Sequence, residues 1–201
     1  YPDNEDVFDR TSFQGTSGRL LFDIALAAGI TRSECYTTYF FKAKMSEKEM
    51  NEIFDLKTRK VANPLLFNVA LETLKTELSY LKPNLIVTLG EVPLYALTSL
   101  KNVFKWRGSI LKSSLILGMK IIPTICPRVT FQRKAKGAKF DPYNYKHYIT
   151  YDLVKARSQS TFHEVILPER NIRILPTYSE ASIYLKEILS AKLPVSTDIE
   201  V

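Results

Sequence analysis

The sequence predicts an α/β domain in which helices cover a mostly parallel central sheet. Helical and strand-like patterns alternate along the chain, and the strand pattern at 83–90 is a short, nearly continuous apolar run, as in a parallel strand buried on both faces. Hydrophobic residues make up 45% of 201 positions, enough for a sizeable core. Because ligands of such sheets bind beyond the carboxyl ends of the strands, a site is expected near 39–42, 89–91 and 123–127.

Three elements are predicted in the first half of the chain. Apolar residues at helical spacing predict a helix over 18–30, ended by Gly29, and β-branched and aromatic residues predict a strand over 34–42. The charged stretch 46–60 fits either a surface helix or a mobile insertion. A long helix is expected over 63–81, with proline in its first turn.

The second half continues the alternation. Helices are predicted over 91–100 and 144–159, and one or two strands over 113–125. After about residue 160 the chain becomes proline-containing, with one amphipathic helix over 179–190 and a terminal strand pattern. This change predicts a domain boundary between 1–160 and 161–201.

Positive charge is concentrated in one third of the chain. The net charge is +7, and residues 101–160 hold 13 lysines and arginines against Asp141 and Asp152 as the acids. Such a surplus favours a phosphate-facing surface, because neutralising phosphates releases counterions. The alternative is a solvated basic face without a partner.

Cysteine usage and hydropathy exclude several classes of protein. Cys35 and Cys126 show no CxxC or zinc spacing, so neither a disulfide framework nor structural zinc is expected. The longest apolar runs fall far short of the roughly 20 residues that a membrane span needs, and an intracellular protein is expected. Because the chain starts at Tyr1 and stops at Val201 within a strand pattern, it is expected to be a piece of something longer.

Six segments in order resemble the motifs of uracil-DNA glycosylases, most closely the family 4 type. They are PDNEDVFDRTSFQGTSGRLL, GITRSECYTTYFFK, KPNLIVTLGEVPLYAL, WRGSI, IIPTICP and DLVKAR, between residues 1 and about 157. The resemblance implies a three-layer α/β/α sandwich with a short, mostly parallel central sheet over 1–160. It also implies base flipping, in which uracil swings out of the duplex into a pocket and its glycosidic bond is cleaved.

The resemblance places two sets of residues in the first segment. Phe13 lies where the family has the phenylalanine that stacks on the flipped base, and Gln14 beside it offers its backbone to that base. Thr16 and Ser17 precede a helix and are candidates for holding a DNA phosphate at its N-terminus. The alternatives are a core aromatic residue and ordinary helix capping.

The chain departs from the family pattern at three positions of the pocket. The family's Gly-Glu, which supplies the water-activating acid, has no secure match, and Asp3 and Asp6 are the nearest candidates. Tyr39 stands where the family has a uracil-reading asparagine, and Cys126 stands where it has a histidine. A thiol is a poor hydrogen-bond donor, and losing one such donor costs about 10²- to 10³-fold in rate. Weak or absent activity on uracil is therefore predicted.

The iron–sulfur cluster that is common in family 4 is not expected. Ala43 stands where one cysteine ligand would be, and 65–75 contains no cysteine. No cofactor is therefore predicted for this domain.

The segment after Cys126 matches the loop that, in the family, enters the minor groove at the flipped nucleotide. Phe131 is the candidate wedge, and Arg107 with Gly108 is a candidate for a further backbone contact. The candidates for phosphate contacts in this loop are Arg128, Arg133, Lys134, Lys136 and Lys139.

The tail carries a second resemblance. LPVSTDIEV resembles the first exonuclease motif of proofreading DNA polymerases, in which Asp198 and Glu200 would bind divalent metal in a complete domain. Residues 161–201 are therefore expected to be a linker and the first strand of a truncated 3′→5′ exonuclease domain. A glycosylase-like domain ahead of such a motif resembles certain phage DNA polymerases.

The preferred function is a DNA-binding, glycosylase-like domain of a phage-type DNA polymerase that serves DNA replication and is weak or inactive on uracil. The alternative is an active glycosylase for uracil or a modified pyrimidine. A third possibility is a protein–protein adaptor for other replication proteins.

Overall fold

A computed structural model describes residues 1–132, 141–166 and 176–191. The chain divides into two compact units, 1–165 and 166–201, a boundary later than residue 160. The loop candidates Arg133, Lys134, Lys136 and Lys139 and the tail candidates Asp198 and Glu200 lie outside the described residues.

The centre of the first unit is a three-stranded sheet in the order β3–β5–β4. Strand β3 (Ile86–Leu89) runs parallel to β5 (Lys120–Thr124), with Leu89 opposite Thr124. The two-residue strand β4 (Leu111–Lys112) pairs antiparallel with β5. The predicted parallel pair is confirmed, and β4 makes the sheet mixed.

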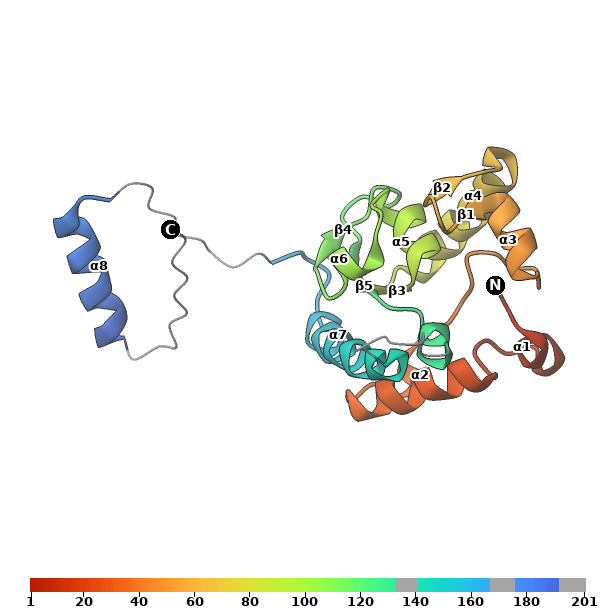
Figure 1. Cartoon of the computed structure of the whole chain (residues 1–201), viewed down its shortest axis with the longest axis horizontal. Coiled ribbons are helices and arrows are strands. Elements are labelled where there is room, and N and C mark those ends of the chain that lie inside the picture. Colours follow the sequence, from red (N-terminus) through yellow and green to blue (C-terminus); the bar gives the residue numbers. More distant parts are fainter. Residues whose placement is uncertain (133–140, 167–175, 192–201) are drawn as a thin grey trace. The chain divides into compact units, whose positions relative to one another are not determined.

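A helical layer covers each face of this sheet (Figure 1). Helices α4 (Pro64–Leu81) and α5 (Glu91–Thr98) share one core with Ile86 and Ile121. Helices α2 (Thr16–Ala27) and α7 (Tyr145–Gln159) share the other core with Val87 and Leu89. Since neighbouring strand residues point to opposite faces, Ile86 and Val87 fill different cores. The expected α/β/α sandwich is thus the observed architecture.

Side-chain caps set the starts of several helices. Asn63 caps α4 and Pro64 occupies its first position, where no amide hydrogen is needed. Reciprocal capping boxes begin α1 (Asn4–Asp9) and α3 (Glu47–Ile53). The second unit contains α8 (Tyr178–Ser190), which also begins with a capping box.

Two predictions in the first half need correction. For 46–60, the surface helix is confirmed as α3, but the same stretch also forms a hairpin of β1 (Phe54–Asp55) and β2 (Lys60–Val61). The prediction of a strand over 34–42 is wrong. A short 3-10 helix, η1 (Arg32–Glu34), is followed by residues 35–42, which have no strand partner and which we call the irregular segment.

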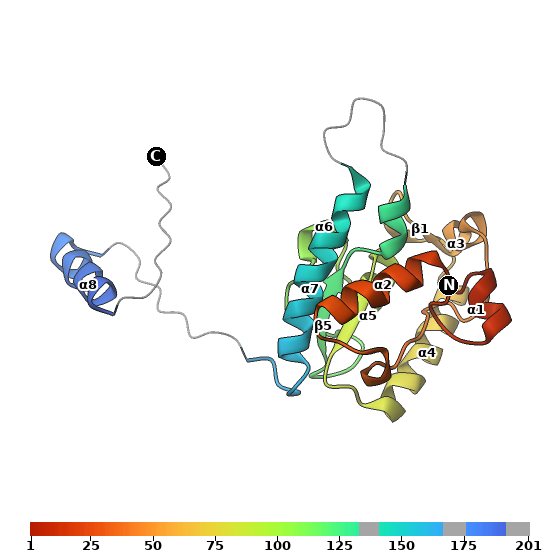
Figure 2. The same ribbon diagram turned by 90° about the horizontal axis from the view of Figure 1, so that it is seen from below.

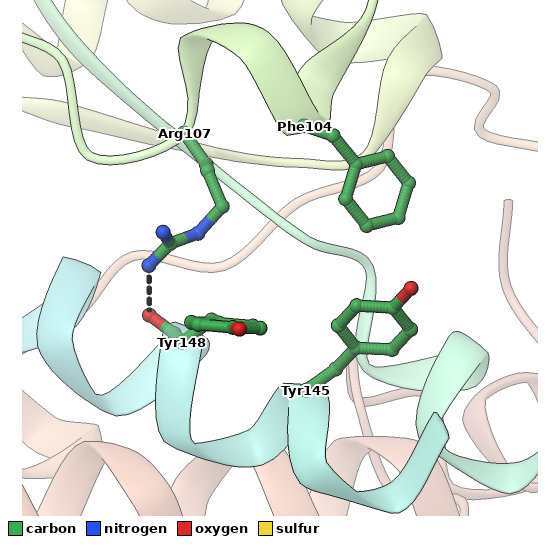
Figure 3. Close-up of a pocket in the computed structure, with 4 residues that line it drawn as sticks. All are labelled: Phe104, Arg107, Tyr145 and Tyr148. Atoms are coloured by element: carbon green, nitrogen blue, oxygen red, sulfur yellow. Dashed lines mark hydrogen bonds between the residues drawn. The ribbon is translucent and has the colours of Figure 1, made fainter. Parts of the chain in front are cut away.

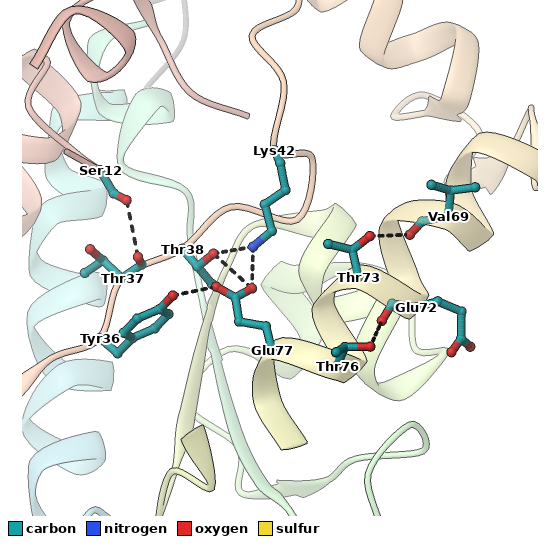
Figure 4. Close-up of polar contacts among 10 residues, drawn as sticks. All are labelled: Ser12, Tyr36, Thr37, Thr38, Lys42, Val69, Glu72, Thr73, Thr76 and Glu77. Atoms are coloured by element: carbon teal, nitrogen blue, oxygen red, sulfur yellow. Dashed lines mark hydrogen bonds and ion pairs between the residues drawn. The ribbon is translucent and has the colours of Figure 1, made fainter. Parts of the chain in front are cut away.

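Side chains hold this irregular segment in place of a sheet ladder. Glu77 of α4 accepts hydrogen bonds from Tyr36 and Thr38 and pairs with Lys42, while Ser12 Oγ donates to Thr37 O (Figure 4). The aromatic and β-branched residues that favoured a strand are thus used for packing and for contacts with α4.

Short elements complete the first unit. They are α6 (Val103–Trp106) and the 3-10 helices η2 (Pro127–Phe131) and η3 (Pro142–Asn144). Of the predicted strand region 113–125, the strand covers 120–124 and a turn occupies 113–119. No helix within the described ranges is both long and apolar enough to cross a membrane.

Candidate functional site

Five of the predicted pocket residues form one hydrogen-bonded cluster, in which three of them donate to the carboxylate of Asp6. Tyr39 donates its hydroxyl hydrogen to Asp6 Oδ2, which also accepts from Asp3 N at 2.9 Å. Asp6 Oδ1 accepts from Gln14 N at 2.6 Å, and Phe13 N donates to the Tyr39 hydroxyl at 2.9 Å. We call these residues the Asp6–Tyr39 cluster. It joins the start of α1 to the turn before α2 and to the irregular segment.

The electrostatics of the cluster favour an ionised Asp6 and a neutral Tyr39. Burial alone would raise the pKa of Asp6, but hydrogen bonds from Tyr39, Asp3 N and Gln14 N outweigh it and lower that pKa. Burial and the hydrogen bond to Asp6 raise the pKa of Tyr39 well above its usual value. The phenol therefore stays protonated and remains a donor to the carboxylate.

The ring of Tyr39 lies against the ring of Phe13. Their centroids are 4.7 Å apart and the ring planes are inclined by 31°. Phe13 has a φ of 60°, which a bulky residue adopts only where its surroundings enforce it. Gly18 permits this turn, because a Cβ at Gly18 would lie 2.3 Å from Phe13 O.

Cys126 follows β5 and lies beside the end of β3. Gly90 N donates to Thr124 O at 2.9 Å, and a Cβ at Gly90 would lie 3.0 Å from Cys126 Cβ. Residues 89–91 and 123–127 thus lie at the ends of two paired strands, whereas 39–42 ends no strand; a ligand site near these segments stays a prediction. Burial raises the pKa of the Cys126 thiol more than the amide and charge of Arg128 lower it. The neutral thiol is neither a nucleophile nor a strong donor.

Comparison with protein families decides what these motifs belong to. A family model described as the uracil DNA glycosylase superfamily matches residues 2–150. The chain belongs to this superfamily. A search of curated proteins finds no match.

Within this uracil-DNA glycosylase superfamily domain, the candidate phosphate site at α2 lies close to acidic groups. Thr16 is exposed and Ser17 half-buried in the first turn of α2. A Cβ at Gly15, just before them, would lie 2.2 Å from Asp3 Oδ2 and 2.5 Å from Glu5 Oε2. These carboxylates oppose an anion there, and phosphate binding by Thr16 and Ser17 stays a prediction.

The candidates Arg107 and Gly108 are engaged inside the domain. Arg107 pairs with Asp152 through bonds of 2.7 and 3.1 Å and donates to Tyr148 O, while Gly108 N donates to Pro123 O. Asp152 is 3% exposed and also accepts from Thr124 Oγ1. Burial raises the pKa of Asp152, although Thr124 and Arg107 favour its charged form. A backbone contact from Arg107 and Gly108 to DNA stays a prediction.

The two described candidates of the basic loop, Arg128 and Phe131, both lie in η2. Arg128 donates to Tyr1 O, and its guanidinium lies 4.5 Å from the centroid of the Tyr1 ring. Phe131 is 49% exposed, as a wedge residue would be. Their contacts with DNA remain predictions.

The superfamily domain also contains an open pocket between α6 and α7. Phe104, Arg107, Tyr145 and Tyr148 line about 390 Å³ (Figure 3). Of these four residues, only Arg107 was a candidate from the sequence. Phe104 on α6 and the two tyrosines on α7 lie about 40 positions apart in the chain, so no local pattern links them. The alternation of aromatic and polar residues in YNYKHY, residues 143–148, is the signal that could have indicated Tyr145 and Tyr148.

The residues of the domain do not fit an iron–sulfur cluster. Four cysteine thiolates are the usual ligands, whereas the chain has Cys35, which is exposed, and Cys126, which is half-buried. Among the described residues, no three His, Cys, Asp or Glu side chains lie together as metal ligands would.

Proposed function

We propose that residues 1–165 are a DNA-binding, glycosylase-like domain that is weak or inactive on uracil. The observation that carries this proposal is the position of Tyr39, whose ring lies against Phe13 and whose hydroxyl joins Phe13 N to Asp6. The family resemblance places a flipped base against the phenylalanine at this position. Tyr39 therefore takes the place of the base.

The remaining chemistry of the pocket supports the same conclusion. Oδ2 of Asp6 accepts from Tyr39 and Asp3 N, and Oδ1 accepts from Gln14 N, so of the roughly four acceptor sites of the carboxylate these bonds leave one, on Oδ1, for a water. Cys126 keeps its proton and offers only a weak donor to a departing uracil anion. Losing one electrostatic donor costs about 10²- to 10³-fold in rate, and the effects of several altered groups combine.

The test is base excision from defined oligonucleotides. The protein is incubated with single strands and duplexes that contain one uracil or one 5-hydroxymethyluracil, and abasic sites are then cleaved with alkali. We expect no strand breaks above a no-protein control. Breaks at the uracil position that increase with protein concentration would overturn the inactive assignment.

An active glycosylase is the second candidate, and the ionised, buried Asp6 favours it. A carboxylate held in the charged form is what a cationic sugar intermediate requires. The same assay separates the candidates: in an active enzyme, Asp6→Asn abolishes the strand breaks, while Asp9→Asn on the exposed side of α1 leaves them unchanged.

We also propose that this domain belongs to a phage-type DNA polymerase and serves DNA replication. Support comes from Asp198 and Glu200, whose motif resembles the metal-binding start of an exonuclease domain. In a complete exonuclease domain these carboxylates would hold divalent metal. The parent gene tests the proposal, because it must then encode the remaining exonuclease carboxylates and a polymerase domain.

A further inference from the structure

The α6–α7 pocket is built mainly from flat side-chain surfaces. The rings of Phe104 and Tyr145 have centroids 5.3 Å apart, and those of Tyr145 and Tyr148 lie 6.1 Å apart. The guanidinium of Arg107 lies 4.6 Å from the centroid of the Tyr148 ring. Figure 3 shows the three rings and the guanidinium around one opening.

Much of this flat surface remains in contact with water. Phe104 is 48% exposed and Tyr148 is 39% exposed. Aromatic faces at the mouth of an open pocket gain free energy when a planar ligand covers them. The size and shape of the opening therefore favour a planar, aromatic ligand.

The side of the pocket formed by Arg107 is held in place by hydrogen bonds within the domain. Asp152 holds the guanidinium through two hydrogen bonds, Tyr148 O through a third, and Thr124 at the end of β5 holds Asp152. This preorganisation lowers the entropic cost of binding. Since Asp152 neutralises Arg107, the pocket gains affinity mainly from stacking rather than from charge.

Two lysines directly follow pocket residues in the chain. Lys105 follows Phe104, with its ammonium 5.4 Å from the centroid of the Trp106 ring, and Lys146 follows Tyr145, with its ammonium 4.0 Å from the centroid of the Tyr143 ring. Both belong to the strongly basic third of the chain, residues 101–160. This combination of stacking surfaces with nearby positive charge is typical of sites for unpaired nucleic acid.

We propose that the α6–α7 pocket stacks an unpaired base of single-stranded DNA. The proposal rests on the proposed DNA-binding function and adds a second site to it. Helices α6 and α7 lie at the opposite side of the first unit from α1 in both views (Figures 1 and 2), so the pocket is separate from the Asp6–Tyr39 cluster. A base within a duplex is covered by its neighbours, so the pocket selects unpaired DNA.

The test compares a labelled single strand with a duplex of the same sequence by fluorescence anisotropy at several salt concentrations. Phe104→Ala is expected to raise the Kd for the single strand by about 5- to 100-fold and to change the Kd for the duplex by less than about twofold. Because stacking releases no counterions, the salt dependence of single-strand binding should stay unchanged.

Three further variants make this result specific. Tyr151→Ala removes a ring on α7 that is 71% exposed and lies outside the pocket, so single-strand affinity should not change. Phe104→Trp should keep the affinity because it keeps a flat ring, whereas Phe104→Leu should lose it although it keeps apolar volume. Thermal unfolding confirms that each variant is folded.

The outcomes separate this site from the broader function. If the protein binds DNA but Phe104→Ala and Tyr151→Ala behave alike, the stacking site is overturned and the DNA-binding function stands. If the unaltered protein binds neither single strand nor duplex at low salt, the DNA-binding function itself fails. Photocrosslinking of a 5-iodouracil single strand should label Phe104, Tyr145 or Tyr148, and labelling confined to other segments would also overturn the site.

Discussion

The hydroxyl of Tyr39 satisfies two groups at once, since it donates to Asp6 and accepts from Phe13 N. A buried carboxylate and a backbone amide in a strained turn thereby gain the partners that burial would otherwise deny them. An asparagine at this position has a shorter side chain and no ring to place against Phe13. Tyr39, in place of the asparagine that the family resemblance implies, thus gives the pocket a different shape and different hydrogen bonds.

The stability of the domain should depend on acid pH through Asp6. Its folded-state pKa lies below the usual value of 3.8, so the unfolded chain binds the proton more readily than the folded domain does. The stabilisation is therefore fully present above about pH 4 to 5 and is lost as the pH falls through the folded-state pKa. Asp6→Asn should lower the free energy of unfolding by about 1–3 kcal/mol at neutral pH.

Urea unfolding of both proteins between pH 3 and pH 7 measures this difference. The gap between wild type and Asp6→Asn should shrink below about pH 4, because the unfolded wild-type chain then takes up a proton at Asp6 more readily than the folded domain does. Asp9→Asn, at the exposed end of α1, is the control and should follow the wild-type curve. A gap that stays constant down to pH 3 would contradict the role assigned to the charge.

The family resemblance named the residues of the Asp6–Tyr39 cluster but not how they contact one another. Phe13, Tyr39 and Cys126 could be located because they lie in motifs with fixed order. The bonds from Asp6 to Tyr39 and Gln14 depend on how α1 packs beside the irregular segment, which no local pattern records. The α6–α7 pocket was missed for a similar reason, since tertiary packing brings Phe104 to Tyr145.

At the scale of elements, helices were easier to predict than strands. Apolar spacing and end signals such as Pro64 and Gly29 belong to each helix itself, and α2, α4, α5, α7 and α8 all form where expected. A strand needs a partner as well as a suitable composition. Residues 34–42 have the composition but no backbone ladder, so α4 binds them through side chains instead.

Glu77 is the main polar link between α4 and the irregular segment, and its removal should loosen that segment. The side chain of Glu77 is 18% exposed, and its carboxylate accepts hydrogen bonds from Tyr36, Thr38 and Lys42 (Figure 4). Glu77→Gln should lower the free energy of unfolding by about 1–2 kcal/mol and speed amide hydrogen exchange in residues 35–42.

Glu72→Gln is the matched control, because Glu72 lies on the same helix with a 66% exposed side chain and a surface pair with Lys75. Such surface pairs contribute about 0–1 kcal/mol, so little change is expected. Equal effects of the two substitutions on exchange in 35–42 would show that Glu77 does not hold the segment.

At the scale of the whole molecule, the described part of the chain forms two units that are built differently. Both cores of the sandwich lie within residues 1–165. Lys120 of β5 links the sheet to the end of this unit. The residue is fully buried, and its ammonium donates to Phe162 O at 2.7 Å and to Glu164 O at 3.2 Å. Helix α8 of the second unit exposes Tyr178 and Leu189.

The concentration of positive charge in residues 101–160 predicts which lysines and arginines contribute most to DNA affinity. Reversing Arg133, Lys134 and Lys136 to Glu should weaken binding to duplex and single strand alike and reduce the slope of log K against log salt by about one per lost phosphate contact. Reversing Lys44, Lys48 and Lys57, which lie outside the basic third, is the control of equal charge.

Gel shifts and anisotropy across a salt series measure both variants. If the two triple substitutions weaken binding to the same extent, the attraction follows net charge alone and the basic third is not the DNA-facing surface. An effect limited to the first variant supports the assignment.

The contacts of Tyr39 also bear on whether the change could be undone in evolution. A mutation that returned a smaller residue to position 39 would strip Asp6 and Phe13 N of a partner before any catalytic group had reappeared. The intermediate would carry a stability loss without a gain in activity, and selection removes proteins that fall below their stability threshold. Under the proposed function, Tyr39 therefore acts as an evolutionary ratchet, which retains the pocket as a structural contact between α1 and the turn at Phe13.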